Sequence, residues 1–322
     1  MNIPGHIDVN TYLKNRFGHK VYKLALSSGC SCPNRDGLLG SRGCIFCSRG
    51  GSGDFAAPAD MSVKEQIDFG KKLLANKLKA TDINELSYIA YFQSFTNTYA
   101  PVEKLKALFT EAITQEEISI LSIATRPDCL SDECIEMLSK LNKIKPVWVE
   151  LGLQTIHEET AEYIKRGYRL EVFEDAVSRL HKAGIEIIVH IILGLPGESE
   201  EMMLDTVKYI AANKKISGIK LQLLHVLEDS ELGDLYSEQL AKVKSIPLIE
   251  QKERQIPMIA AKMLGLQITN IDQYISIIKK CLQILPKDII IHRLTGDAPR
   301  KSLLYPLFSS DKKRILNAIK TD

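Results

Sequence analysis

The stretch CSCPNRDGLLGSRGCIFCSRGGSG, residues 30–53, decides how the rest of the chain is interpreted. It holds four of the seven cysteines, and three of them follow the pattern C-x11-C-x2-C with Phe46 directly before the last. Thiols crowded this closely in a cytosolic protein usually hold a metal, because unbound thiolates repel one another and oxidise. The pattern favours the binding loop of an iron–sulfur cluster.

Two other interpretations of these thiols stay open at this point. A cluster held by three cysteines keeps one iron open for another ligand, whereas four thiolates would close it. Glycines throughout the loop let the backbone wrap closely and direct N–H groups at an anionic cluster. Inert thiols are one alternative. The other is a structural zinc site, whose C-x-C half is uncommon, with the ligands Cys30, Cys32, Cys44 and Cys47.

Composition limits the class of protein. The chain has 322 residues, 45% of them hydrophobic and 25% charged, which is enough to bury a core and argues against disorder. An odd number of cysteines, no apolar leader and no apolar run of roughly 18–20 residues predict a soluble protein of the reducing cytoplasm. The net charge of +2 does not by itself indicate nucleic-acid binding. Basic residues gather at 14–23 and 293–314, either as solvated faces or as a groove for a polyanion.

Six apolar runs rich in β-branched residues are each followed by a helical pattern. After the cysteine loop, their starts lie 29 to 38 residues apart, the length of one βα unit. This alternation predicts an α/β fold with a parallel sheet covered by helices, either open and doubly wound or a partial barrel. Its ligands would bind at the carboxyl ends of the strands. The predicted strands are 21–26, 85–92, 118–125, 147–153, part of 185–197, and 218–227.

The alternation of strands and helices ends after about residue 228, so two domains are expected. Residues 1–228 would form the core with the cysteine loop, and residues 229–322 a helical extension packed on it. Helical patterns at 247–264 and 271–283 and a short strand within 288–300 are predicted in the extension.

A cysteine loop after the first strand of six βα units, with an aromatic residue before the last cysteine, resembles the radical S-adenosylmethionine (SAM) superfamily. The spacing departs from that superfamily's commonest C-x3-C-x2-C. It is similar to the loop of the YhcC/YtqA-like subfamily, which is related to the Elongator catalytic subunit. The resemblance implies a partial (β/α)6 TIM-like barrel and covers nearly the whole chain. The matching motifs are SCPNRDGLLGSRGCIFC (31–47), FQSFTNTYAP (92–101), SIATRPDCL (122–130), WVELGLQT (148–155), HIILGLPGE (190–198), LLHVLEDSELGDLY (223–236) and IHRLTGDAP (291–299).

The resemblance implies the cofactors and their first ligands. Cys32, Cys44 and Cys47 would hold a [4Fe–4S] cluster, with Cys30 outside the set. SAM would bind the open iron, and one electron from the cluster would cleave it to a 5′-deoxyadenosyl radical that takes a hydrogen from the substrate. Phe46 would lie near the adenine.

Further SAM contacts are implied by resemblance to oxygen-independent coproporphyrinogen oxidase-like sequences. Gln154 matches a glutamine that binds the ribose, and Arg166 matches an arginine that reaches the SAM carboxylate. His190 stands where those sequences have an acid, and Gly194 would let backbone groups approach the adenine. Three more contacts are expected from their places after the second and third strands: Gln93, Thr125 and Arg126.

Other chemistry-bearing residues lie in or after the strands. Glu150 falls inside an apolar strand, and a buried carboxylate needs a partner, whether structural or functional. Contacts with substrate are expected from His225, His292, Arg293 and Asp297. Three thiols outside the loop are expected to be inert and buried: Cys129, Cys134 and Cys281.

The resemblance implies a radical SAM enzyme that processes the 5-carboxymethylaminomethyl side chain of the tRNA wobble (2-thio)uridine. Its partners would be tRNA and a flavodoxin- or ferredoxin-type electron donor, without a membrane. One alternative is the same chemistry on a small metabolite or peptide. The other is a non-catalytic, zinc-stabilised nucleic-acid binding protein.

Overall fold

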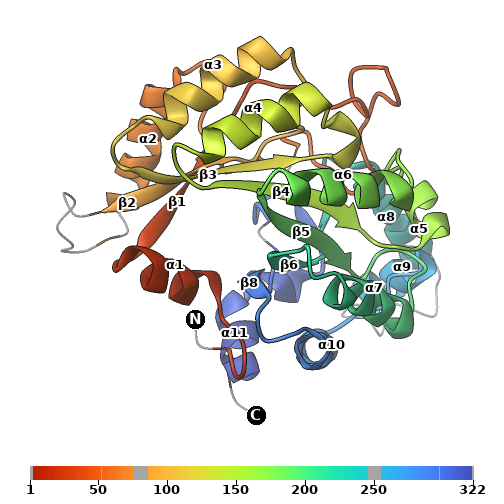
Figure 1. The fold of residues 1–322 in the computed structure, drawn as a ribbon. Coiled ribbons are helices and arrows are strands. Elements are labelled where there is room, and N and C mark those ends of the chain that lie inside the picture. Colours follow the sequence, from red (N-terminus) through yellow and green to blue (C-terminus); the bar gives the residue numbers. More distant parts are fainter. Residues whose placement is uncertain are drawn as a thin grey trace.

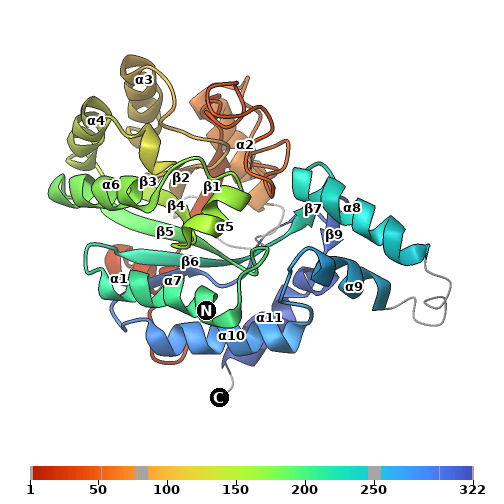
Figure 2. The same cartoon turned by 90° about the vertical axis from the view of Figure 1, so that its right-hand side faces the viewer.

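The computed structural model describes residues 3–51, 53–75, 78, 86–245, 255–296 and 298–320. Seven parallel strands in this part form one sheet that curls into a partial barrel, with helices around its outside (Figure 1, Figure 2). The predicted partial TIM-like α/β fold is therefore confirmed. In sheet order the strands are β1 (Val21–Leu26), β2 (Ser87–Phe92), β3 (Ile118–Thr125), β4 (Val147–Gln154), β5 (Glu186–Leu193), β6 (Gly218–Leu223) and β8 (Ile290–Arg293).

Helices follow the strands because the chain must return to start the next parallel strand. Ser131 and Ser199 cap two of these helices by accepting hydrogen bonds from the backbone N–H groups of Cys134 and Met202. Gly184 ends another in the left-handed conformation, with φ +74°. The helices between strands are α2 (Val63–Ala75), α3 (Val102–Ile113), α4 (Asp132–Asn142), α5 (Glu158–Tyr163), α6 (Leu170–Lys182) and α7 (Glu200–Ala212), with a 3₁₀ turn at Pro127–Cys129.

Helix α1 (Val9–Phe17) closes the amino end of the barrel. Its Leu13 packs among inward-facing strand side chains that include Trp148, which is fully buried. Arg16 pairs with Glu186 at 2.6 Å, at the first residue of β5. The barrel interior is therefore apolar and covered by α1 at this end.

The chain after β6 completes the barrel and one side of its rim. Strand β8 extends the sheet beyond β6, so the short predicted strand is part of the barrel itself. Helix α10 packs against α7 and α11, and α8 packs against α9, which Figure 2 shows beyond the carboxyl end of β6. These elements are β7 (Val226–Leu227), α8 (Glu231–Lys244), α9 (Ile256–Met263), α10 (Ile271–Ile284), β9 (Leu303–Tyr305), a 3₁₀ turn at Leu307–Ser310, and α11 (Lys312–Lys320).

Some boundaries differ from those predicted. The strand predicted at 218–227 breaks after Leu223, because β7 leaves the barrel and pairs antiparallel with β9. The helix predicted at 247–264 is described only as α9, since residues 246–254 lie outside the described part. Residue 85, at the start of the strand predicted at 85–92, also lies outside it.

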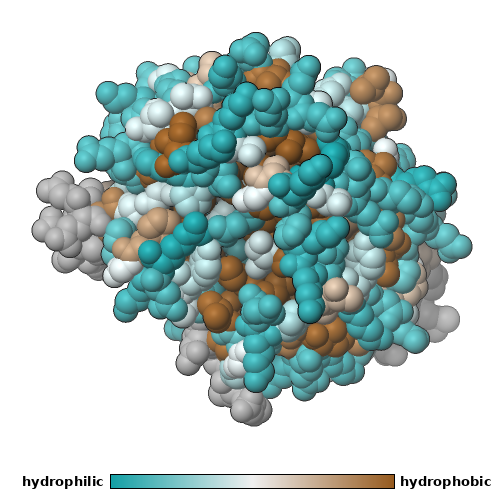
Figure 3. Space-filling model, in the orientation of Figure 1, coloured by the Kyte–Doolittle hydropathy of each residue, from teal (hydrophilic) through white to brown (hydrophobic). Residues whose placement is uncertain are grey.

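The outer surface is mixed in polarity. The face in Figure 3 is mainly hydrophilic, with hydrophobic residues in separate patches. Within the described ranges, no helix is long and apolar enough to cross a membrane.

Candidate active site

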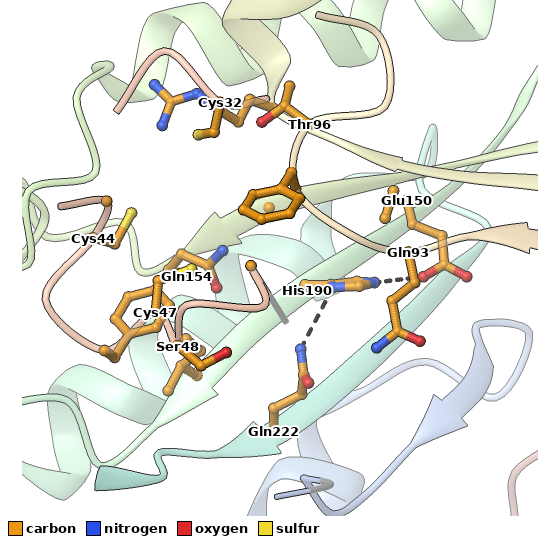
Figure 4. Close-up of a pocket in the computed structure, with 18 of the residues that line it drawn as sticks. Cys32, Cys44, Cys47, Ser48, Gln93, Thr96, Glu150, Gln154, His190 and Gln222 are labelled. Atoms are coloured by element: carbon orange, nitrogen blue, oxygen red, sulfur yellow. Dashed lines mark hydrogen bonds and ion pairs between the residues drawn. The ribbon is translucent and has the colours of Figure 1, made fainter. Parts of the chain in front are cut away.

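A cavity of about 230 Å³ lies at the carboxyl ends of the barrel strands. The cysteine loop lines one part of it, with Cys32, Cys44 and Cys47 all among the lining residues. In Figure 4 these cysteines surround one end of the pocket, and Glu150 and Gln93 lie towards the other. The strand order thus brings a loop after β1 together with side chains of the later strands.

Hydrogen bonds within the cysteine loop hold its shape. The Arg35 guanidinium donates to the carbonyl oxygens of Cys47, at 3.1 Å, and Ser48. The Asn34 amide donates to the Lys165 carbonyl at 2.8 Å and lies 3.4 Å from the Cys44 sulfur. These contacts therefore help to position the cysteine loop at the rim.

Glycines in the loop are required by close packing. Gly51 has φ +58°, and a Cβ there would lie 2.3 Å from the Phe95 ring. A Cβ on Gly53 would lie 1.9 Å from the Ser94 hydroxyl oxygen and 2.9 Å from its Cα. Side chains at these positions would push the cysteine loop away from the barrel rim.

The three cysteines, which line one cavity, suit a [4Fe–4S] cluster. Burial, with the neighbouring Cys47 and Cys32, raises the pKa of the Cys44 thiol to about 12, so its thiolate needs a cation beside it. No three Cys, His, Asp or Glu side chains in the described ranges come close enough to hold one metal ion. A [4Fe–4S] cluster takes each cysteine on a different iron, so its ligands need not meet at one point.

Cys30 lies apart from this set. It is 7% exposed, belongs to the main hydrophobic core, and is not among the residues that line the cavity. Burial raises the pKa of its thiol, although a hydrogen bond with Ser28 opposes this. Its surroundings are those of a packed core thiol, as are those of Cys134 and Cys281, whereas Cys129 is only partly buried.

Most of the predicted SAM-contacting residues line the same cavity as the cysteines. Gly194 does not, because it packs against Ile268, where a Cβ would lie 3.2 Å from that side chain. The predicted residues at the cavity are Phe46, Gln93, Thr125, Arg126, Gln154, Arg166 and His190.

Gln154 offers an unused polar atom to a ligand. It ends β4 with φ +68°, and its side-chain oxygen is buried without a hydrogen-bond partner among the described residues. Buried acceptors of this kind are normally satisfied, so a donor such as a sugar hydroxyl fits here. Gly152 leaves space for the amide, since a Cβ would lie 2.7 Å from its nitrogen.

The two arginines at the rim mainly hold the rim together. Arg166 is 1% exposed and donates to the carbonyl oxygens of Leu153 and Thr155 at 3.0 and 2.7 Å. Arg126 pairs with Asp128 through two hydrogen bonds and donates to the Arg166 carbonyl at 2.8 Å. Most of their donors are thus directed at protein groups, with one face of each towards the cavity.

The predicted substrate contacts divide into two groups. His225 and Arg293 line the cavity, and the His225 Nε2 atom is buried without a partner in the described chain. His292 is not a lining residue; its ring packs edge-on against Trp148, with centroids 5.1 Å apart. Asp297 lies outside the described residues.

A charged layer lies between the apolar base of the barrel and the rim. The Glu150 carboxylate, 1% exposed, accepts hydrogen bonds from Ser122, His190, Lys23 and Lys220. Burial alone would raise the pKa of Glu150, but Lys220, Lys23 and His190 together hold it well below its usual range. Burial and the Lys220 charge lower the pKa of His190 to about 4, so its ring is neutral near pH 7.

Sequence reasoning missed three members of this site: Tyr91, Lys220 and Gln222. The signal for two of them was present, because Lys220 and Gln222 alternate with apolar residues in GIKLQLL and so share the inward face of β6. Gln222 lies beside His190, with its amide nitrogen 3.4 Å from Nδ1 (Figure 4).

Comparison with known proteins places this site in a family. Residues 39–210 match the family model of the radical SAM superfamily, and residues 262–322 match the Radical_SAM C-terminal domain. The chain belongs to the radical SAM superfamily. Members of this superfamily bind a [4Fe–4S] cluster and SAM, so the protein is an enzyme of this cofactor class.

Three similar proteins illustrate the relationship. "Uncharacterized protein YtqA" of Bacillus subtilis is 39% identical over 97% of this chain and 87% of its own length. A tRNA uridine(34) acetyltransferase of Methanocaldococcus jannaschii is 34% identical over 118 residues, covering 36% of this chain and 21% of its own. The structure of Methanocaldococcus infernus Elp3 superimposes with a TM-score of 0.58 at 20% identity, over 88% of this chain and 58% of that one. The last comparison shows a shared fold.

Proposed function

We propose that this protein is a tRNA-modifying enzyme that processes the 5-carboxymethylaminomethyl side chain of the wobble (2-thio)uridine towards the aminomethyl form. A cluster held by the three cysteines would supply the electron for reductive cleavage of SAM, the source of the hydrogen-abstracting chemistry. The observation that carries the proposal is one cavity with cluster-type cysteines at one end and the cationic side chains of Lys220 and Arg293 at the other.

The proposed cofactor contacts follow from this geometry. Cys32, Cys44 and Cys47 would hold the cluster, and Gln154 would accept a hydrogen bond from the SAM ribose. The remaining predicted contacts around the cavity would position SAM between the cluster and the charged layer: Phe46, Gln93, Thr125, Arg126, Arg166 and His190. Residues 229–322 would form an extension that closes one side of the cavity and supplies Arg293 and His292 near the base of the barrel.

The tRNA part of the proposal rests on similarity and on charge. Local identity to a tRNA uridine(34) acetyltransferase points to a substrate of the same class. Exposed Arg300 and Lys301 are separated only by Ser302 from β9, which pairs with β7 beyond the carboxyl end of β6, on the side of the cavity. A wobble base would enter the cavity flipped out of its stack.

The other basic segment does not contribute to this surface. Arg16 contacts Glu186 and His19 contacts Ser87, and both partners are the first residues of their strands. Residues 14–20 therefore lie at the closed end of the barrel, away from the cavity.

The test compares modified nucleosides before and after reaction. Cluster-loaded protein, SAM, a reductant and tRNA carrying the carboxymethylaminomethyl group are incubated without oxygen, and the digested nucleosides are measured by mass spectrometry. The proposal expects the aminomethyl nucleoside with wild-type protein and none with Cys44→Ala. An unchanged nucleoside profile with wild-type protein would contradict the tRNA substrate, and reductant-dependent loss of SAM with a small metabolite or peptide would favour that alternative.

A further inference from the structure

The end of the cavity away from the cysteines contains a lysine that the cofactor contacts do not use. Lys220 of β6 is 2% exposed and lines the cavity. Its ammonium group donates to the Glu150 carboxylate and, at 3.2 Å, to the Tyr91 hydroxyl, and it lies 4.6 Å from the centre of the Tyr91 ring. Burying an ammonium group is costly even when it is paired, so this lysine requires a reason.

The need to neutralise Glu150 does not explain why Lys220 is buried. One carboxylate oxygen accepts from Ser122 at 2.9 Å and from Lys23 at 3.3 Å. The other accepts from His190 at 2.7 Å and from Lys220. Two ammonium groups therefore face one carboxylate, and Lys23 alone would neutralise it. With Arg293, which also lines the cavity beside Lys220, this end of the cavity holds more cationic side chains than Glu150 alone can pair with.

We propose that Lys220 binds a carboxylate of the substrate at the inner end of the cavity, with Gln222 beside it on β6. This inference rests on the proposed function, in which the side chain of the wobble base ends in a carboxylate. A lysine has three N–H donors, and two are used by the described chain, so one remains for this group.

The shape of the site favours a carboxylate on a base side chain over a backbone phosphate. Lys220 lies inside the barrel, above the apolar cluster around Trp148 that closes its base. A base side chain can extend to this depth, whereas a phosphate between two nucleotides would have to carry the RNA backbone with it.

The inference is tested with two nucleosides and three variants. Dissociation constants of 5-carboxymethylaminomethyluridine and of its carboxamide analogue are measured on cluster-loaded protein with SAM, without oxygen. A charged hydrogen bond predicts that wild-type protein prefers the acid by about 10-fold or more. Lys220→Met is expected to bind the two nucleosides alike, and Lys220→Arg to keep part of the preference.

Lys23→Met is the matched comparison. It removes one positive charge from the same carboxylate, as Lys220→Met does, but leaves the Lys220 N–H groups at the cavity, so part of the preference for the acid should persist. Lys220→Met leaves Glu150 with three other donors, and cluster absorbance and the unfolding midpoint show whether it remains folded.

Each outcome bears on the inference. Equal binding of the two nucleosides by wild-type protein, binding of neither, or an undiminished preference in Lys220→Met would overturn it. A Lys220-dependent preference in a protein that leaves tRNA unchanged would support this carboxylate site and refute the proposed function. Processed tRNA without any preference for the acid would support the proposed function and refute the carboxylate site.

Discussion

Removing the charge of Glu150 should destabilise the barrel strongly. Glu150→Gln keeps the size of the side chain but leaves Lys23 and Lys220 without a counter-charge. The new amide nitrogen would also face donors where a carboxylate oxygen accepted hydrogen bonds from His190 and Lys220, or from Ser122 and Lys23. Loss of one partner from a buried ion pair costs about 3–5 kcal/mol. We expect a cost in this range, because the carboxylate is 1% exposed.

The assay is urea unfolding of wild-type and variant proteins, followed by circular dichroism without oxygen. Adding Lys220→Met to Glu150→Gln removes one of the uncompensated ammonium groups, so the double variant should recover about 1.5 kcal/mol or more of the loss. A cost below about 1 kcal/mol for Glu150→Gln, or a double variant that is less stable still, would refute this account of the charged layer.

The stability difference between the wild-type and Glu150→Gln proteins should also depend on pH. The pKa of Glu150 is depressed in the folded state, so its contribution is present above the ordinary value of about 4.3. It is lost as the pH falls through the folded-state pKa. The stability difference between wild-type and Glu150→Gln proteins should therefore shrink below about pH 4.3, and a difference that grows there would have the wrong sign.

Two further changes test the rim and the loop. Arg166→Ala leaves buried carbonyl oxygens without donors and should cost about 3 kcal/mol or more in urea unfolding, whereas Arg169→Ala, on an exposed side chain, should cost under about 0.5 kcal/mol. Gly53→Ala forces a Cβ against Ser94 and should lower the iron bound per chain. Gly184→Ala, also strained but in open space, should cost about 1–2 kcal/mol in stability and leave the iron content unchanged; equal iron in both variants would contradict the loop geometry.

The sheet could be predicted because its strands are locally encoded. VYKLAL and ISILSIAT are strands in the structure with the bounds that were expected. The pairing of β8 with β6 could not be predicted, since it joins segments separated by about 70 residues and depends on how α8 to α10 pack. Helix α1 was missed although Val9, Tyr12, Leu13 and Phe17 recur at helical spacing and Asp8 and Gly18 at its ends were readable caps.

Some features of the candidate site could likewise be predicted from local sequence, whereas others depend on tertiary packing. The cysteine loop could be recognised from local spacing, and alternation along single strands places Glu150 and Lys220 inside the barrel. The contact between the two side chains depends on the stagger between β4 and β6, and no local sequence pattern indicates that stagger. The separation of Cys30 from the other loop cysteines is also tertiary, because it results from packing against the main core.

The central claim is that three loop cysteines hold a four-iron cluster. Iron, sulfide and zinc are measured in protein purified without oxygen from wild type, Cys30→Ala, Cys32→Ala, Cys44→Ala and Cys47→Ala. The account predicts about four irons per chain in wild type and Cys30→Ala, and loss of the cluster in the other three variants. One zinc per chain and no iron, or a loss of iron in Cys30→Ala equal to that in Cys44→Ala, would contradict it.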